Sequence, residues 1–202
     1  ALRMLADYEL PMDTYNMLAA SRMRNQRNGM FQRLFSPGNQ EEAPDLARAK
    51  EQILEKFAEA VKTPEDMAKA QQALAETAEH IMEGMINDRE ISSLDVRELK
   101  VLRSQIQISS RMSREENYAV PVLIADELTN VQLKIVRGKK TRGMVDIFFE
   151  NERLGKVAAR LQATEKRVEG FVAADREETF ETFKRRVQDL ARELSDEGQE
   201  LR

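Results

Sequence analysis

Residues 145–163 read VDIFFENERLGKVAARLQA, and this stretch decides the fold class that the sequence predicts. Apolar side chains stand at every second position before and after a polar turn. A period of two places them on one face of a strand, so the stretch predicts two strands joined by a turn. That turn runs from Asn151 to Gly155, where glycine permits backbone angles that other residues resist. The alternating residues are Val145, Ile147 and Phe149, then Val157, Ala159, Leu161 and Ala163.

The same alternation extends in both directions along the chain. It appears at 131–135, before a glycine-bounded polar turn, and again at 168–174. A final helix capped by Asp175 follows and ends at Gly198. We therefore expect three or four consecutive antiparallel strands with one helix packed on them. The apolar stripe of that helix is Phe180, Phe183, Val187, Leu190 and Leu194.

The first 118 residues carry the helical period instead, with apolar side chains three and four positions apart. We expect a long helix over 13–35 with Asp13 as its N-cap, a second helix from about Pro44, and a fourth capped by Ser92 or Ser93. The third helix has the clearest start signal. Its sequence Thr63-Pro64-Glu65-Asp66 offers a capping residue, a proline at the first helical position and an acidic residue three positions after the cap.

Long amphipathic helices joined by short connectors favour an antiparallel bundle. The alternative is an extended helical hairpin whose methionine-rich face needs a partner to cover it. We interpret the methionines as core residues, because flexible thioethers fill gaps in protein interiors. The sequence thus predicts an α+β protein: a helical domain over 1–117, then a small antiparallel sheet with one packing helix over 118–202.

Composition excludes several classes of function. The chain has no cysteine, which excludes disulfides, zinc–cysteine sites, iron–sulfur clusters and thiol nucleophiles. The formal net charge is −4, carried by the first 118 residues, so neither half has the basic excess typical of a nucleic-acid binder. No apolar stretch approaches the roughly 20 residues of a membrane span, and no secretory leader is visible. We expect a cytoplasmic protein.

The residues that could carry chemistry are few. His80 lies among Glu76, Glu79 and Glu83, but a di-iron bundle site needs two Glu-x-x-His pairs on separate helices and this chain has one histidine. We interpret His80 as a surface residue. The eight glycines are isolated and form no phosphate-binding loop. We therefore expect a non-enzymatic protein with no cofactor and no metal.

Two basic clusters are candidates for binding. The denser one surrounds the predicted turn at 138–143 and consists of Lys134, Arg137, Lys139, Lys140 and Arg142. Turns between strands are exposed and polar in any case, so one interpretation is a solvated hairpin tip. The other is a docking point for an acidic partner surface or a phosphate. The second cluster, Arg22, Arg24 and Arg27, is expected to face solvent on the first long helix.

The stretch over about 145–198 resembles the C-terminal domain of the flagellar hook-length control protein family. That family has an alternating strand, an acidic turn ending in Leu-Gly, a second strand, a hairpin return and a helix with a glycine just beyond it. The matching parts here are Leu154-Gly155, the strands 156–163 and 168–174, and the helix ending at Gly198. The family usually has a proline in the turn, where this chain has Asn151. The chain is also similar to uncharacterised proteins of Gram-positive gut anaerobes.

The resemblance implies a module that contacts the cytoplasmic switch component of a flagellar type III export gate, by binding alone. Leu154 and Gly155 would then shape the turn, and Lys139, Lys140 and Arg142 would offer charge to the partner. Such a protein could itself be exported through the flagellar apparatus. The alternatives left open are a helical scaffold or regulatory protein unrelated to flagella, and an enzyme or nucleic-acid binder without a visible motif.

Overall fold

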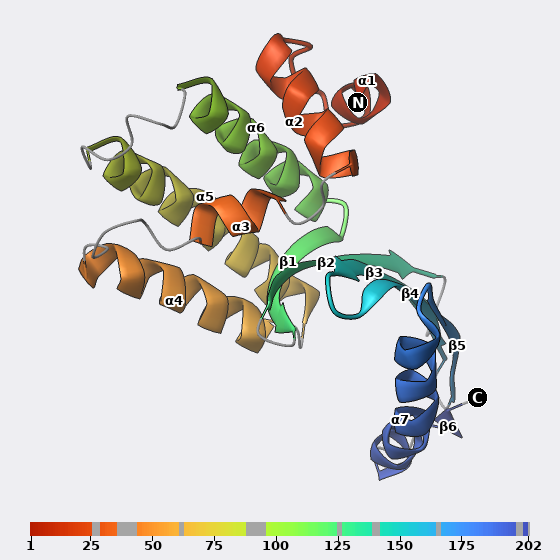
Figure 1. The fold of residues 1–202 in the computed structure, drawn as a ribbon. Helices are drawn as coiled ribbons and strands as arrows, with labels where there is room; N and C mark the ends of the chain where they lie inside the picture. Colours follow the sequence, from red (N-terminus) through yellow and green to blue (C-terminus); the bar gives the residue numbers. More distant parts are fainter. Residues whose placement is uncertain are drawn as a thin grey trace.

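The computed structural model shows a helical layer followed by a strongly curved sheet, with one further helix inside the curve (Figure 1). It describes residues 1–25, 29–35, 44–60, 63–87, 96–124, 127–138, 142–164, 167–196 and 200–201. The class is α+β, with the helices before the sheet and one helix after it, as the sequence predicts, but the described sheet has five antiparallel strands where the sequence predicted three or four.

Six helices make up the first layer. They are α1 (Leu2–Asp7), α2 (Thr14–Asn25), α3 (Gly29–Phe35), α4 (Pro44–Ala60), α5 (Pro64–Asn87) and α6 (Val96–Ser113). The start of α5 follows the predicted capping pattern: the Asp66 amide donates to Thr63 Oγ1 (3.1 Å), and the Thr63 hydroxyl donates to Asp66 Oδ2 (2.7 Å). The fourth helix begins at Val96, and its predicted caps Ser92 and Ser93 lie outside the described residues.

The predicted single helix over 13–35 is wrong, because α2 and α3 are separate helices. Its predicted start is confirmed, since Asp13 Oδ1 accepts hydrogen bonds from the amides of Tyr15 and Asn16 (2.8 and 2.9 Å). The two helices pack against different parts of the molecule. Ala19 and Ala20 of α2 lie in a small cluster with Ile108 of α6, whereas Phe31 of α3 lies in the main core.

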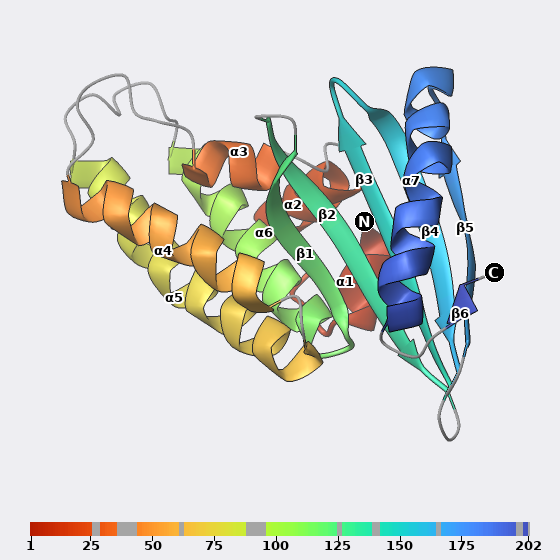
Figure 2. The same cartoon turned by 90° about the horizontal axis from the view of Figure 1, so that it is seen from below.

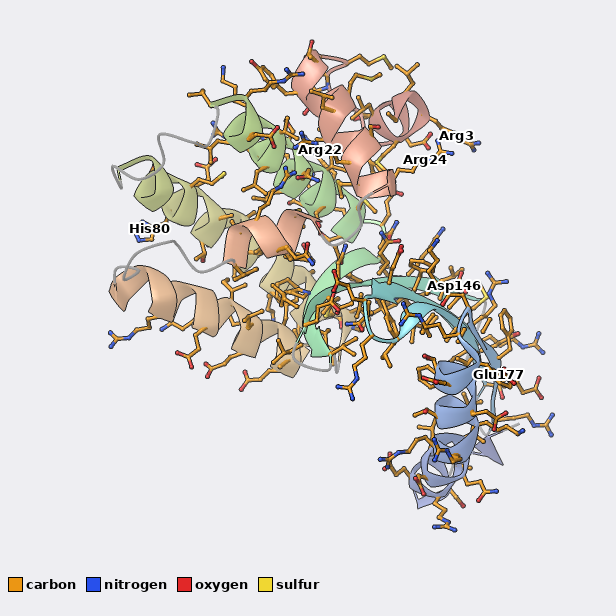
Figure 3. The ribbon with its side chains drawn as sticks, in the orientation of Figure 1. Arg3, Arg22, Arg24, His80, Asp146 and Glu177 are labelled. Atoms are coloured by element: carbon orange, nitrogen blue, oxygen red, sulfur yellow. The ribbon has the colours of Figure 1, made fainter. Side chains whose placement is uncertain are left out.

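Five antiparallel strands form a meander in which each strand pairs with the next. They are β1 (Asn117–Ile124), β2 (Glu127–Arg137), β3 (Gly143–Asn151), β4 (Gly155–Ala163) and β5 (Arg167–Ala174). The register places Leu133, Ile147, Ala159 and Val172 opposite one another. Val172 is half-buried while its neighbours Phe171 and Ala173 are exposed, so this set shares the face that α7 covers. We call this the concave face. The other, convex face carries charged side chains such as Asp146, labelled in Figure 3.

The main core is shared between the helices and the first strands. It joins Ile53 and Phe57 of α4, Met67 and Leu74 of α5, and three consecutive residues of β1, Tyr118, Ala119 and Val120. Because neighbouring strand residues point to opposite faces, β1 is buried on both sides. The chain changes from helix to strand near the predicted boundary at 117–118, but no gap in the packing accompanies that change.

The chain ends in a β-α-β unit. Helix α7 (Glu177–Asp196) follows β5, runs back across the concave face, and leads to β6 (Glu200–Leu201), which pairs with β5 in parallel (Figures 1 and 2). A strand, a crossover helix and a parallel neighbouring strand form a common right-handed arrangement in sheets. Here the described part of the second strand is Glu200–Leu201.

Candidate protein-binding site on the C-terminal sheet

The predicted turn between β3 and β4 is organised by the side chain of Asn151, which is buried. Its Oδ1 accepts hydrogen bonds from the amides of Arg153 (2.9 Å) and Leu154 (3.0 Å), which closes the turn. Its Nδ2 donates to Thr129 Oγ1 (2.9 Å) and to the carbonyl oxygen of Ile124 (3.2 Å). Asn151 therefore fixes the turn and ties it to the β1–β2 end of the sheet.

Gly155 is needed at the end of this turn for two reasons. Its φ is +74°, a backbone conformation that side chains other than glycine rarely adopt. A Cβ atom at this position would also collide with Asp175 Oδ1. That oxygen accepts a hydrogen bond from the Lys156 amide (2.7 Å), so the carboxylate that the sequence predicts as the cap of the last helix bonds to β4.

The turn is also joined to the start of α7. The Thr179 hydroxyl donates to the carbonyl oxygen of Leu154 (2.8 Å), and the Arg176 guanidinium donates to that of Arg153 (2.8 Å). We call this set the turn cluster, and its members are Asn151, Arg153, Leu154, Gly155, Asp175, Arg176 and Thr179. Its solvent side is charged, with Glu152, Arg153, Lys156 and Glu177 exposed (Figure 3).

The structure separates the predicted site residues into two groups. Arg142 is exposed just before β3 begins, whereas Leu154 and Gly155 follow its last residue. A strand rises about 3.3 Å per residue, so the two groups lie on the order of 30 Å apart. Lys139 and Lys140 lie outside the described residues. Arg137 donates to Glu116 Oε1 (2.7 Å), so part of the basic cluster is already neutralised within the chain.

The convex face holds an ordered charge pair between neighbouring strands. Arg160 of β4 donates two hydrogen bonds to Asp146 of β3, at 2.6 and 3.0 Å. The guanidinium holds the pKa of the Asp146 carboxyl below its usual range, because it stabilises the charged form. This fork geometry orders the two side chains but leaves them partly in solvent, where an ion pair contributes little to stability.

The predicted arginine set on α2 does not form a free basic surface. Arg22 donates to both carboxylate oxygens of Glu98 on α6 (2.5 and 2.7 Å), and Arg33 of α3 adds a third bond (2.9 Å). The hydrogen bond from Arg22 is the largest cause of the lowered pKa of Glu98. Arg24 is exposed, and Arg27 lies outside the described residues. The hydrogen bonds of Arg22 and Arg33 to Glu98 therefore connect α2, α3 and α6.

The remaining candidate residues of the helical layer lie in open positions. His80 is exposed on α5 (Figure 3), and no group of metal-ligating side chains occurs within the described part of the chain. A hollow of about 380 Å³ lies where α5 and α6 meet the segment at Leu10 and Pro11. Its main polar contact is an ion pair between Arg103 and Glu79 (2.6 Å), with both side chains more than half exposed.

Sequence reasoning identified the stripe of α7 but missed how much of it reaches solvent. Phe180 is 44% exposed, Val187 48% and Leu190 40%, and Phe171 on the convex side of β5 is 59% exposed. Single exposed apolar residues are common, but here four lie at one end of the sheet.

Comparisons with known proteins give no relative. No protein-family model matches the chain, and no curated protein or solved structure matches it significantly. Among the helices that the structure describes, none is long and apolar enough to cross a membrane.

Proposed function

We propose that this chain is a non-enzymatic protein-interaction module whose C-terminal sheet docks on a component of a flagellar type III export gate, in the control of hook length. The observation that carries the proposal is the turn cluster. The resemblance over 145–198 depends on Leu154-Gly155, and these residues form a tight turn joined to the start of α7. The succession β3, turn, β4, β5 and α7 also agrees with the order of elements that the resemblance implies.

In this proposal the turn residues act by shape. Gly155 lets the chain pass close to Asp175, and Thr179 holds α7 against the turn, so the backbone that carries the exposed side chains is held in place. A charged surface on a preorganised backbone supports specific docking, because little backbone freedom is lost on binding. The basic tip with Lys139, Lys140 and Arg142 would be a second, separate contact for an acidic surface.

The proposal assigns no catalytic step, cofactor or metal. The sequence has no cysteine, which leaves no thiol nucleophile, and it has a single histidine as an imidazole base. Binding is the activity that its charged surfaces and exposed apolar residues support.

The test uses the full chain and the purified cytoplasmic domain of the switch component of a flagellar export gate. Isothermal titration calorimetry should show saturable binding. Arg153→Glu, at the turn, should weaken it by about 10-fold, because a reversed charge repels a matched partner surface. Arg3→Glu is the matched control: it makes the same charge reversal at a 95% exposed side chain of α1, away from the sheet, and should leave binding unchanged.

A second control separates a lost surface from a lost fold. Leu161 lies half-buried on the concave face, and Leu161→Asp should unfold the sheet because it places an unpaired charge there. Circular dichroism checks this. If the unchanged chain does not bind the switch component, the flagellar assignment is wrong.

A second candidate is a helical scaffold or regulatory protein unrelated to flagella. It is favoured by the core that the helices share with β1, which makes the helical layer part of one rigid body with the sheet. Its predicted methionine-rich groove has less support, because Met30, Met67, Met82 and Met112 are buried. Stable self-association of the pure chain in analytical ultracentrifugation, without binding to the switch component, would favour this candidate.

A further inference from the structure

The β-α-β unit of β5, α7 and β6 leaves part of the outer edge of β5 without a described neighbour. Strand β6 pairs with β5 at two positions, Arg167 with Glu200 and Val168 with Leu201. Among the described residues, no strand pairs with the rest of that edge of β5, from Glu169 to Ala174. Figure 2 shows β6 beside the end of β5 where that strand begins. Within the residues that the structure describes, the outer edge of β5 is therefore unpaired over most of its length.

The hydrogen bonds at the two ends of the β4–β5 pair identify which backbone groups face this outer edge. The Thr164 amide donates to the carbonyl oxygen of Arg167 (2.8 Å), and the Asp175 amide donates to that of Lys156 (3.0 Å). In an antiparallel pair, hydrogen-bonded residues alternate with residues that point away. The odd-numbered residues of β5 therefore face β4, and the amide and carbonyl groups of Gly170, Val172 and Ala174 face outward.

Helix α7 places apolar side chains beside the same outer edge of β5. Thr179 faces the β3–β4 turn, as its bond to Leu154 shows. Successive residues of an α-helix are about 100° apart around its axis. Phe180 therefore lies about 100°, and Val187 about 80°, around the helix from Thr179. Because α7 is right-handed and runs antiparallel to β5, that rotation turns both side chains toward the outer edge of the sheet. Their exposure of 44% and 48% agrees with this placement.

From these two observations we infer that the outer edge of β5 binds an extended segment of a partner protein, which adds a strand parallel to β5 in line with β6. Gly170, Val172 and Ala174 would supply the backbone hydrogen bonds. Alternate side chains of the bound segment would lie under Phe180 and Val187. Those side chains of the segment must therefore be apolar. Those on the other face would lie beside Phe171. The inference rests on the proposed binding role of this sheet and adds the mode of binding.

A second copy of the chain fits this edge less well. Two β5 strands related by a twofold axis would run antiparallel. If they paired about Val172, residues 176 and 177 of one copy would fall opposite Val168 and Arg167 of the other, and β6 already occupies those positions. A parallel segment that starts after β6 meets no such conflict.

The first test needs no partner. Amide hydrogen exchange of the free chain, read by NMR, should show fast exchange at Gly170, Val172 and Ala174 and roughly 100-fold slower exchange at Phe171 and Ala173, which bond to β4. Slow exchange at all five amides would mean that the edge is already covered and would overturn the inference.

The second test selects random linear peptides that bind the immobilised full chain. We expect peptides with apolar residues at alternate positions, and their addition should slow exchange at Gly170, Val172 and Ala174. Val187→Glu should weaken binding by about 10-fold or more, because it places a charge over an apolar contact. Gln188→Glu is the matched control, since it adds the same charge at the next exposed position of α7, and it should bind normally.

A third variant addresses the backbone directly. Val172→Pro removes an outward amide that makes no bond to β4, and edge strands tolerate proline at such positions. It should keep the circular dichroism spectrum and lose peptide binding. If no peptide is selected, or if selected peptides bind Val187→Glu and Val172→Pro as well as the unchanged chain, the edge is not the site. If those two variants still bind the export-gate domain, the proposed function holds, but binding does not occur by strand addition at β5.

Discussion

The two ends of the curved sheet differ in how completely they are covered. At the β1 end, helices pack on both faces, and one outward backbone group of the edge strand is bonded to a helix: Gln71 of α5 donates to the carbonyl oxygen of Ala119 and accepts a bond from Ser109 (3.2 Å). At the β5 end, one helix lies on one face and Phe171 is exposed on the other. The first end has the properties of a core, and the second has those of a binding surface.

The largest change in the free energy of unfolding is expected when a phenylalanine at the β1 end is replaced, compared with one at the β5 end. Phe57 is fully buried at the β1 end, and Phe57→Ala should lower the free energy of unfolding by about 3–5 kcal/mol, because it removes a large side chain and leaves a cavity. Phe180→Ala, at the β5 end, should cost less than about 1 kcal/mol. Urea denaturation measures both. Similar losses would show that the β5 end is as tightly packed as the β1 end.

The next prediction concerns the turn that anchors α7. Gly155→Ala should cost about 1–3 kcal/mol, since it forces a left-handed backbone on a residue with a Cβ atom and pushes that atom against Asp175. Gly143→Ala is the matched control at the other end of β3, where an added Cβ meets no atom within 4 Å. Thermal unfolding should separate the two variants clearly. If both variants lower the unfolding temperature equally, Gly155 has no special role in the turn.

A smaller effect is expected at the ion pair between helices. Glu98→Gln should cost about 1–2 kcal/mol at neutral pH, because Arg22 and Arg33 lose a shared, partly buried carboxylate. The folded state lowers the pKa of Glu98, so its contribution is present above the unfolded pKa and is lost as pH falls through the folded one. The difference between variant and unchanged chain should therefore shrink in acid.

The smallest effect is expected on the convex face. Asp146→Asn breaks the pair with Arg160, whose side chains are 32% and 51% exposed, and solvent screens such a pair. Its stability should stay close to that of the unchanged chain at moderate salt. A loss as large as that of Glu98→Gln would show that the outer face contributes more than its exposure indicates.

The strands were predictable where one face is buried and the other is not. Alternation identified β2 to β5, and the turn at Asn151 to Gly155 lies where the pattern placed it. Strand β1 was not identified, because burial on both faces removes alternation and leaves a continuous apolar run interrupted by Pro121. Proline is tolerated there because β1 is an edge strand in the sheet.

The candidate site was less predictable than the fold. The sequence marked Leu154 and Gly155 as turn residues, but it could not show that Asp175 and Thr179 would join the same turn from 20 or more residues away. The stripe of α7 was visible, whereas its partial exposure depends on where β5 and β6 stop beneath it. Contacts of this kind are set by tertiary packing, which local periodicity does not encode.

The edge at β1 also limits what strand pairing at β5 can lead to. A sheet polymerises when each added molecule presents a new edge for the next one, as in fibrils. In this molecule the edge strand β1 contains Pro121, which has no amide hydrogen to donate, and its Ala119 carbonyl is bonded to Gln71, so the β1 edge is a poor template for a further strand. Growth would stop after one addition, which makes edge pairing here compatible with a discrete complex instead of a filament.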